Sequence, residues 1–86
     1  MAANAQHLLE AVKLALAQDW DGAHSIAQDY SDPTANWIHA VLHKIEGDAW
    51  NSRYWYARTN GKRYEDFEDP HAELISIQST LNANQN

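Results

Sequence analysis

The chain of 86 residues forms one domain at most, and a protein this short buries only roughly 60–65% of the surface that its unfolded form exposes. Its 6 basic and 12 acidic residues give a formal net charge of −6, which disfavours nucleic acid and anionic membranes as partners. Cysteine is absent, so disulfides, thiolate nucleophiles and cysteine-ligated zinc are excluded.

A core this small depends on large side chains. Each tryptophan side chain can bury on the order of 200 Å² of surface that water would otherwise contact. We expect at least three of the four tryptophans to lie inside the protein or at an interface. They are Trp20, Trp37, Trp50 and Trp55.

The N-terminal stretch lacks the uninterrupted apolar run of a secretory signal, because Glu10 and Lys13 fall inside its only apolar-rich part. No stretch approaches the roughly 18 apolar residues that a membrane span needs. We therefore expect a cytoplasmic protein without a membrane partner.

The first predicted hairpin covers residues 5–30. Apolar residues recur at three- and four-residue steps, which predicts a helix over 5–18. The segment "DWDG" then offers aspartates as helix caps and a glycine that tolerates a turn. A second helix follows, and its apolar face consists of Ala23, Ile26, Ala27 and Tyr30.

The second predicted hairpin covers residues 34–60. Pro33 suits the first turn of a helix, behind Ser31 or Asp32 as the cap. Gly47 ends that helix, and Asp48 is placed to cap the next one. The inward face of this fourth helix consists of Ser52, Trp55, Tyr56 and Thr59.

A last helix is predicted over residues 69–82, with Asp69 as its cap and Pro70 in its first turn. We expect residues 83–86 to fray. The packing positions are Leu74, Ile75, Ile77 or Gln78, and Leu81.

The two hairpins resemble each other at an offset of 29 residues, which places Asp19 on Asp48. Core positions then match in pairs: Leu8 with Trp37, Leu9 with Ile38, Val12 with Val41, Leu16 with Ile45, Ala23 with Ser52, and Ile26 with Trp55. A helix pair cannot cover its own apolar faces, so stacking is required. We predict an all-α domain over 1–86, with two stacked antiparallel hairpins and a C-terminal capping helix, five helices in all.

The corner segments "AQDWDGA" and "EGDAWNS" resemble the helix-turn-helix corner of tetratricopeptide repeats, with Ala23 and Ser52 as the small residues at the helix contact. The resemblance covers roughly residues 5–60 and implies a protein-binding scaffold. The offset of 29 is shorter than the repeat length of about 34 in that family. The string "WIHAVLHKIEGDAWNSRYWYAR" also resembles small bacterial proteins, a resemblance that implies no activity.

The third helix carries three polar side chains of possible functional interest. On a helical wheel, His39, His43 and Glu46 lie opposite the apolar face, so we expect the imidazoles to look outward. One interpretation is a binding face bordered by His24. The alternative is a metal site or metal-dependent enzyme that uses His39, His43 and Glu46, with His24 as a further ligand. A hydrolytic H-E-x-x-H helix is disfavoured because Ala40 follows His39.

The segment "RYWYARTNGKR" mixes aromatic side chains with four cations and is followed by the acidic segment "EDFED". The cations are Arg53, Arg58, Lys62 and Arg63. We predict that local ion pairs neutralise them. Binding of an acidic peptide and, less favoured, of nucleic acid are the alternatives.

Ordinary enzyme machinery is not visible, because no serine lies in a recognisable triad motif and no glycine-rich phosphate loop is present. We predict an interaction module, without a cofactor, that binds a protein partner or a second copy of itself. A corner tryptophan, Trp20 or Trp50, would anchor that interface if exposed, and otherwise covers the end of the core. The expected partner-binding residues are His24, His39, His43, Glu46, Arg53 and Tyr54.

Overall fold

The computed structural model describes residues 2–83, and every regular element within that range is helical. The predicted all-α class is therefore confirmed. Of the tail expected to fray, Ala83 ends the last helix and residues 84–86 lie outside the described part of the chain. The elements are α1 (Ala2–Leu16), α2 (Trp20–Ala27), α3 (Pro33–Ile45), α4 (Ala49–Tyr56), the short 3₁₀ helix η1 (Tyr64–Asp66) and α5 (Pro70–Ala83).

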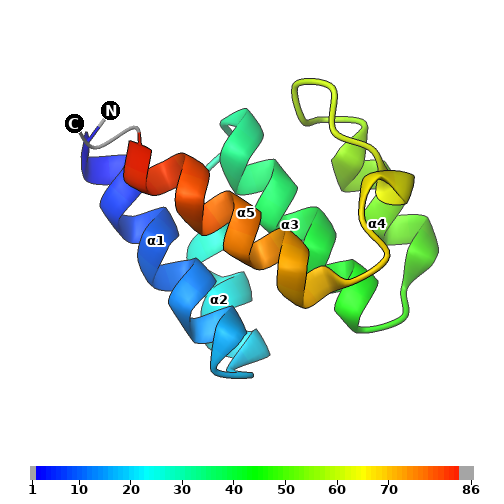
Figure 1. The fold of residues 1–86 in the computed structure, drawn as a ribbon, viewed down its shortest axis with the longest axis horizontal. Helices are drawn as coiled ribbons and strands as arrows, with labels where there is room; N and C mark the ends of the chain where they lie inside the picture. The colour runs from blue at the N-terminus through cyan, green and yellow to red at the C-terminus, as the bar shows by residue number, and fades with distance from the viewer. Residues whose placement is uncertain (1, 84–86) are drawn as a thin grey trace.

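Helix α3 forms the centre of the molecule. It contacts α1, α2, α4 and α5, and all eight residues from 35 to 42 are buried (Figure 1). A helix buried all round has no solvent face, whatever its polar pattern. The prediction that His39 looks outward from α3 is therefore wrong, because α2 and α4 cover that face.

Three of the aspartates predicted as caps lie directly before a helix and cap its first turn. Asp19 accepts a hydrogen bond from the Gly22 backbone at 3.1 Å, and Asp32 and Asp48 do the same for the third residue of α3 and α4. Pro33 occupies the first turn of α3, as predicted. Local sequence signals thus set where each of these helices starts.

The corners of the two hairpins are built alike. The Asp19 amide bonds to the Leu14 carbonyl at 2.8 Å, and 29 residues later Asp48 bonds to His43 at 2.9 Å. The left-handed residue is Gln18 in the first corner and Gly47 in the second. Gly22, predicted to serve a turn, lies inside α2 instead, where a Cβ would come 2.5 Å from the Asp19 carboxylate.

The core gathers on α1, α3 and α5, with small side chains where helices approach closely. Ala23 and Ser52 are fully buried at the two corners, and the Ser52 hydroxyl donates to the Ala40 carbonyl at 2.7 Å. On α5, Ile75 was predicted to pack inward but is 47% exposed. Glu73 is buried in its place.

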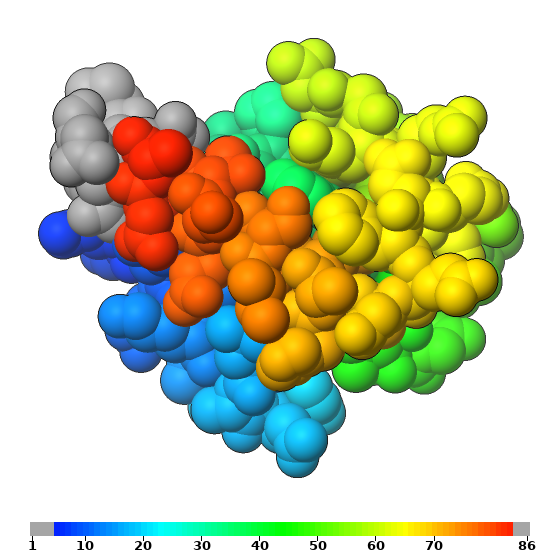
Figure 2. Space-filling model, in the orientation of Figure 1, coloured from blue at the N-terminus to red at the C-terminus, as the bar shows by residue number. Residues whose placement is uncertain are grey.

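The segment joining α4 to α5 packs back against the start of α5 and covers the adjoining face of the molecule (Figure 2). Three tryptophans contribute to the core, as predicted. Trp37 is buried within it, and Trp20 and Trp55 are half-buried and pack against the core cluster. Trp50 is 75% exposed. Within residues 2–83, no helix is both long and apolar enough to cross a bilayer.

Candidate functional site

Three imidazoles meet where α2 and α4 cover α3. His24 comes from α2, and His39 and His43 lie one turn apart on α3. Their ring centroids are separated by 4.4 Å for His24–His39, 5.0 Å for His39–His43 and 5.5 Å for His24–His43. One possible ligand atom of each ring lies within 4.8 Å of the others. We call these residues the histidine cluster.

Local sequence explains how the rings converge. His39 and His43 are four residues apart, so α3 stacks their side chains on one face, and the rings are nearly parallel at 18°. His24 follows Ala23, whose small, fully buried side chain lets α2 pack closely against its neighbours. The His24 ring meets both others edge-on, at 84° and 90°. The cluster therefore joins the first hairpin to the second.

His39 is the most buried member of the cluster, with 6% of its surface exposed. The Trp55 ring stacks on it from α4, with the centroids 4.0 Å apart and the planes 17° apart. Burial, followed by the nearby charges of His24 and His43, lowers the pKa of His39 to about 4. At neutral pH this imidazole is uncharged, and an uncharged imidazole is the form that binds metal ions.

His43 lies at the outer edge of the cluster, and its side chain is 16% exposed. Its Nδ1 lies 3.4 Å from Glu46 Oε1 and 3.6 Å from Asp48 Oδ2. This Nδ1 is itself buried and completes a hydrogen bond with neither carboxylate. Two carboxylates therefore stand beside Nδ1 of His43.

Asp48 has two roles at this point of the fold. Its side chain caps α4 and accepts a 2.6 Å hydrogen bond from the Asn51 amide. That hydrogen bond is the main reason that the pKa of Asp48 is lowered, so the carboxyl is ionised at neutral pH. A negative charge thus stands beside His43 on the side away from the other two rings.

The structure brings together only part of the predicted site. His24, His39 and His43 form one cluster, whereas Glu46 sits on the outer side of His43 and does not belong to the ligand group. His39 is too buried to contact a partner as predicted. Trp55 was expected to point inward, but its stacking on His39 has no signal in the sequence.

Arg53 and Tyr54, the other two predicted partner-binding residues, lie on the exposed side of α4. Tyr54 is 41% exposed, and its ring lies nearly parallel to that of Trp50, with the centroids 6.3 Å apart. The Arg58 guanidinium lies 3.6 Å from the Tyr54 ring centroid. Trp50, Tyr54 and Arg58 form a surface that shares no residue with the histidine cluster, and we call it the outer face of α4. The two are neighbours through Trp55, because the Tyr54 ring meets Trp55 edge-on at 5.2 Å and Trp55 stacks on His39.

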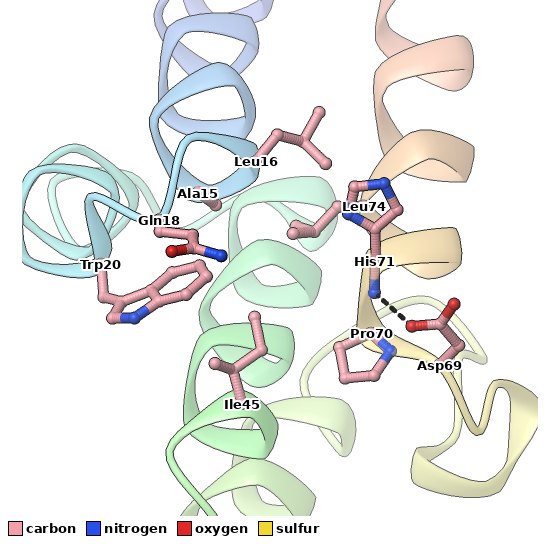
Figure 3. A pocket seen from close by; sticks show the side chains of 9 residues that line it. All are labelled: Ala15, Leu16, Gln18, Trp20, Ile45, Asp69, Pro70, His71 and Leu74. Carbon is pink, nitrogen blue, oxygen red and sulfur yellow. Dashed lines mark hydrogen bonds between the residues drawn. The ribbon is translucent and has the colours of Figure 1, made fainter.

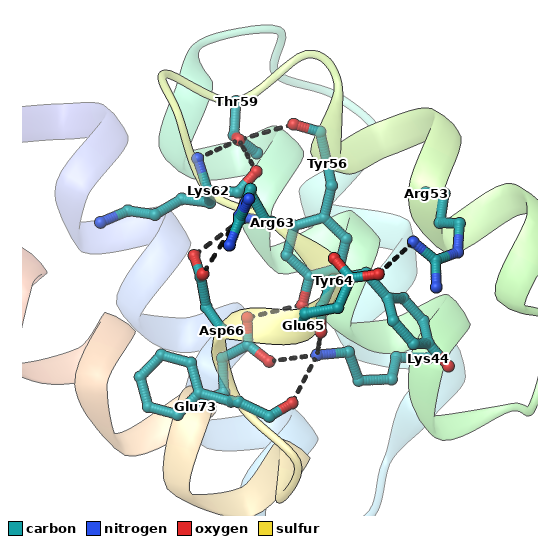
Figure 4. Close-up of polar contacts among 11 residues, drawn as sticks. Lys44, Arg53, Tyr56, Thr59, Lys62, Arg63, Tyr64, Glu65, Asp66 and Glu73 are labelled. Carbon is teal, nitrogen blue, oxygen red and sulfur yellow. Dashed lines mark hydrogen bonds and ion pairs between the residues drawn. The ribbon is translucent and has the colours of Figure 1, made fainter.

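A second polar group was missed by the sequence analysis. Glu73 of α5 is fully buried and accepts hydrogen bonds from Trp37 Nε1 at 2.8 Å and from Tyr56 Oη at 2.5 Å. Figure 4 shows Glu73 with Tyr56 and Lys44. Lys44 Nζ pairs with it at 2.8 Å. The spacing held a signal, because Glu73 lies four residues before buried Ile77 and so falls on the apolar face of α5.

The remaining donors of this Lys44–Glu73 network are also satisfied. Lys44 Nζ donates to the carbonyls of Tyr64 at 3.0 Å and Phe67 at 3.1 Å, which fastens the segment after α4 to α3. Burial and the Glu73 carboxylate raise the pKa of Tyr56 far above its usual range, so its hydroxyl stays a donor. The network holds α3, α4 and α5 together and offers no free group to a ligand.

The predicted neutralisation of surface cations is confirmed at two positions. Arg53 pairs with Glu65 at 2.5 Å, and Arg63 pairs with Asp66 at 3.6 Å (Figure 4). The hydrogen bond from Arg53 lowers the pKa of the Glu65 carboxyl.

A hollow of about 230 Å³ lies between Trp20 and Ile45 on one side and the start of α5 on the other (Figure 3). Its lining is mostly apolar and includes none of the three clustered histidines. The Asp69 carboxylate accepts a hydrogen bond from the His71 backbone at 3.0 Å. This hollow is an end of the core, which Trp20 covers, and it presents no group of converging polar side chains.

Comparisons with protein-family models, with curated proteins and with solved structures gave no match. The functions proposed for this protein therefore rest on its amino-acid sequence and on the arrangement of the described residues.

Proposed function

We propose that the protein binds a divalent transition-metal ion, of the zinc, copper or nickel class, through His24, His39 and His43. The observation that carries this proposal is the convergence of three imidazoles from two helices, with one ligand atom of each within 4.8 Å of the others. Imidazole nitrogen suits these metals, whereas calcium and magnesium prefer oxygen ligands. Three protein ligands leave at least one coordination position open.

Metal–imidazole bonds of about 2.0–2.1 Å place the nitrogens of a tetrahedral site roughly 3.3 Å apart. The side chains reach that spacing from 4.8 Å through small rotations, because His24 and His43 stand at the edge of the core. Glu46 and Asp48 support the proposal, since a carboxylate beside the second ring nitrogen commonly orients a metal-binding histidine. A hydrolytic role is not included, because Ala40 occupies the position of the general base in an H-E-x-x-H helix.

The test is a titration of tag-free protein with zinc, copper and nickel by isothermal calorimetry. We expect saturable binding of one ion per chain. His24→Ala should weaken it at least roughly tenfold, because two ligands remain in place of three. His71→Ala is the matched control, since His71 is exposed on α5 and outside the cluster, and it should leave the affinity unchanged. Equal binding by the wild type and His24→Ala would overturn the proposal.

We propose protein binding as a second function, and the exposure of Trp50 at 75% specifically favours it. A large exposed aromatic side chain beside Tyr54 is typical of residues that anchor protein contacts. In this proposal the matching corners are tandem repeats of a tetratricopeptide-like scaffold in a bacterial cytoplasmic protein. The occupant of the outer face of α4 is a partner protein or a second copy.

Light scattering across a range of concentrations tests the self-association part of this second proposal. A dimer that Trp50→Ala converts to monomer would support a second copy as the partner. If the protein is a monomer at every concentration, the partner must be a different protein. If no displayed peptide binds either, the second proposal is contradicted and the metal proposal is unaffected.

A further inference from the structure

We infer that the outer face of α4 docks a short acidic segment of a partner protein, one that carries an aromatic or aliphatic anchor side chain. This inference rests on the second proposed function, protein binding, and is independent of the metal site. It names the chemistry of the partner, which the exposure of Trp50 alone does not.

The outer face combines three side-chain types that dominate binding energy at protein contacts. Trp50, Tyr54 and Arg58 follow one another at four-residue steps, so they form a single row along α4 and its C-terminal turn. Tyr54 lies between the other two, with Trp50 stacked at 6.3 Å and the Arg58 guanidinium at 3.6 Å. Because Tyr54 is already packed between the other two side chains, it loses little freedom when a partner binds.

The charge of this face selects an acidic partner. No carboxylate occurs between Asp48 and Glu65 in the sequence. Arg53 is already paired with Glu65, but no ion pair involves Arg58 among residues 5–83, where side chains are described. Among the described residues, the Arg58 side chain donates to the Tyr54 carbonyl alone, at 2.9 Å. A partner carboxylate would therefore meet a planar guanidinium with donors to spare.

The size of the face favours a short segment over a folded partner. Helix α4 has 8 residues, which corresponds to a length of about 12 Å. A standard interface between folded proteins buries about 800 Å² on each side, and a two-turn helix does not offer that area. One anchor side chain against Trp50 and one or two carboxylates near Arg58 match the surface present.

A single-stranded nucleic acid also stacks on aromatic side chains and pairs with arginine. The formal net charge of −6 and the carboxylates next to α4, such as Glu65 and the capping Asp48, oppose it. A short peptide can place its few carboxylates next to Arg58 alone. A nucleic acid has one phosphate per nucleotide, so further phosphates along the strand would lie close to those carboxylates and be repelled.

The experiment is a selection of short peptides from a random displayed library against the whole wild-type protein. We expect the selected peptides to be enriched in aspartate and glutamate and to share an aromatic or aliphatic residue. Binding of the selected peptides, measured by fluorescence anisotropy, should weaken roughly tenfold or more in Trp50→Ala and in Arg58→Glu. It should also weaken as salt is raised.

Lys13→Glu is the matched control, because it makes the same change in net charge at an exposed site on α1. It should bind the peptides as the wild type does, and circular dichroism should show all variants folded. Selected peptides without acidic enrichment, or peptides that bind Arg58→Glu and wild type equally, would overturn this inference alone. Failure to select any peptide would contradict both this inference and the second proposed function.

Two further outcomes assign the face to another occupant and so also overturn the inference. One is a dimer in light scattering that Trp50→Ala dissolves. The other is tighter binding of a single-stranded oligonucleotide than of any selected peptide, with loss of that binding in Arg58→Glu.

Discussion

Two buried polar groups flank α3, and they differ in how completely their hydrogen-bonding atoms are satisfied. In the Lys44–Glu73 network, opposite charges meet at 2.8 Å and every polar side chain has a partner. In the histidine cluster, three like groups meet, and the buried Nδ1 of His43 completes no hydrogen bond. At 100° per residue, the two groups occupy roughly opposite sides of α3.

We propose a structural role for the first group and a binding role for the second. A buried polar network that satisfies itself rigidifies the fold and has nothing left to give a ligand. Three imidazoles packed together gain little from one another, and one possible ligand atom of each lies within 4.8 Å of the others. The experiments below break one group at a time, beginning with the largest expected effect.

Glu73→Gln should have the largest effect on stability. The substitution keeps the size of the side chain but leaves Lys44, whose side chain is 6% exposed, as an uncompensated buried charge. Removing one partner of a buried ion pair typically lowers the free energy of unfolding by about 3–5 kcal/mol. Urea denaturation at pH 7 measures the change in the free energy of unfolding.

The double variant Lys44→Met with Glu73→Gln sharpens this result. It removes both charges and keeps an acceptor for Trp37 and Tyr56, so much of the lost stability should return. Glu68→Gln, at an exposed position, is the control and should change stability by less than about 0.5 kcal/mol. A small effect of Glu73→Gln alone would show that the network is not structural.

The pH dependence of stability should report on His39. Its folded pKa of about 4 lies below the unfolded value of 6.5, so the unfolded state binds more protons between these values. Stability is therefore lost as the pH falls from about 6.5 towards 4, by up to about 3 kcal/mol from this group. Urea denaturation at a series of pH values measures it.

Other titratable groups lie near His39, namely His24, His43 and the two carboxylates beside His43. His39→Phe isolates the contribution of His39, because it keeps an aromatic ring against Trp55 and removes the titrating group. The stability of this variant should fall less steeply with acid than that of the wild type. Parallel curves for the two proteins would contradict the prediction.

Zinc should stabilise the protein through the histidine cluster. At a free concentration one hundred times the dissociation constant, the gain is about 2.7 kcal/mol, measured as a rise in the melting midpoint. The gain should disappear in His24→Ala and persist in His71→Ala. It should also persist in Arg58→Glu, since the outer face of α4 is separate from the cluster. A rise that His24→Ala retains would place the ion elsewhere.

Arg53→Ala should have the smallest effect. The Arg53–Glu65 pair is short, but both side chains are 56% exposed, and solvent screens such pairs so that they contribute little to stability. Urea denaturation of Arg53→Ala at low and high salt should show a small loss of stability, and the loss should shrink with salt. A loss comparable to that of Glu73→Gln would mean that this surface pair supports the fold as the buried pair does.

The starts of the helices could be predicted from the amino-acid pattern alone. Asp19, Asp32 and Asp48 cap helices, and Pro33 fits a first turn, because these effects involve atoms within a few residues of one another. Three- and four-residue apolar spacing likewise indicated the helices and most core positions. The i,i+4 spacing of His39 and His43 fixed their shared face on α3.

Which helix faces are buried depends on how the helices pack against one another. The polar side of α3 looked solvent-exposed because a helical wheel describes one helix and not the helices packed against it. Trp55 covers His39 and Lys44 reaches Glu73 across gaps of 16 and 29 residues, and no local pattern encodes such contacts. His24 likewise joins the cluster only because α2 folds onto α3, which converts three separate side chains into one site.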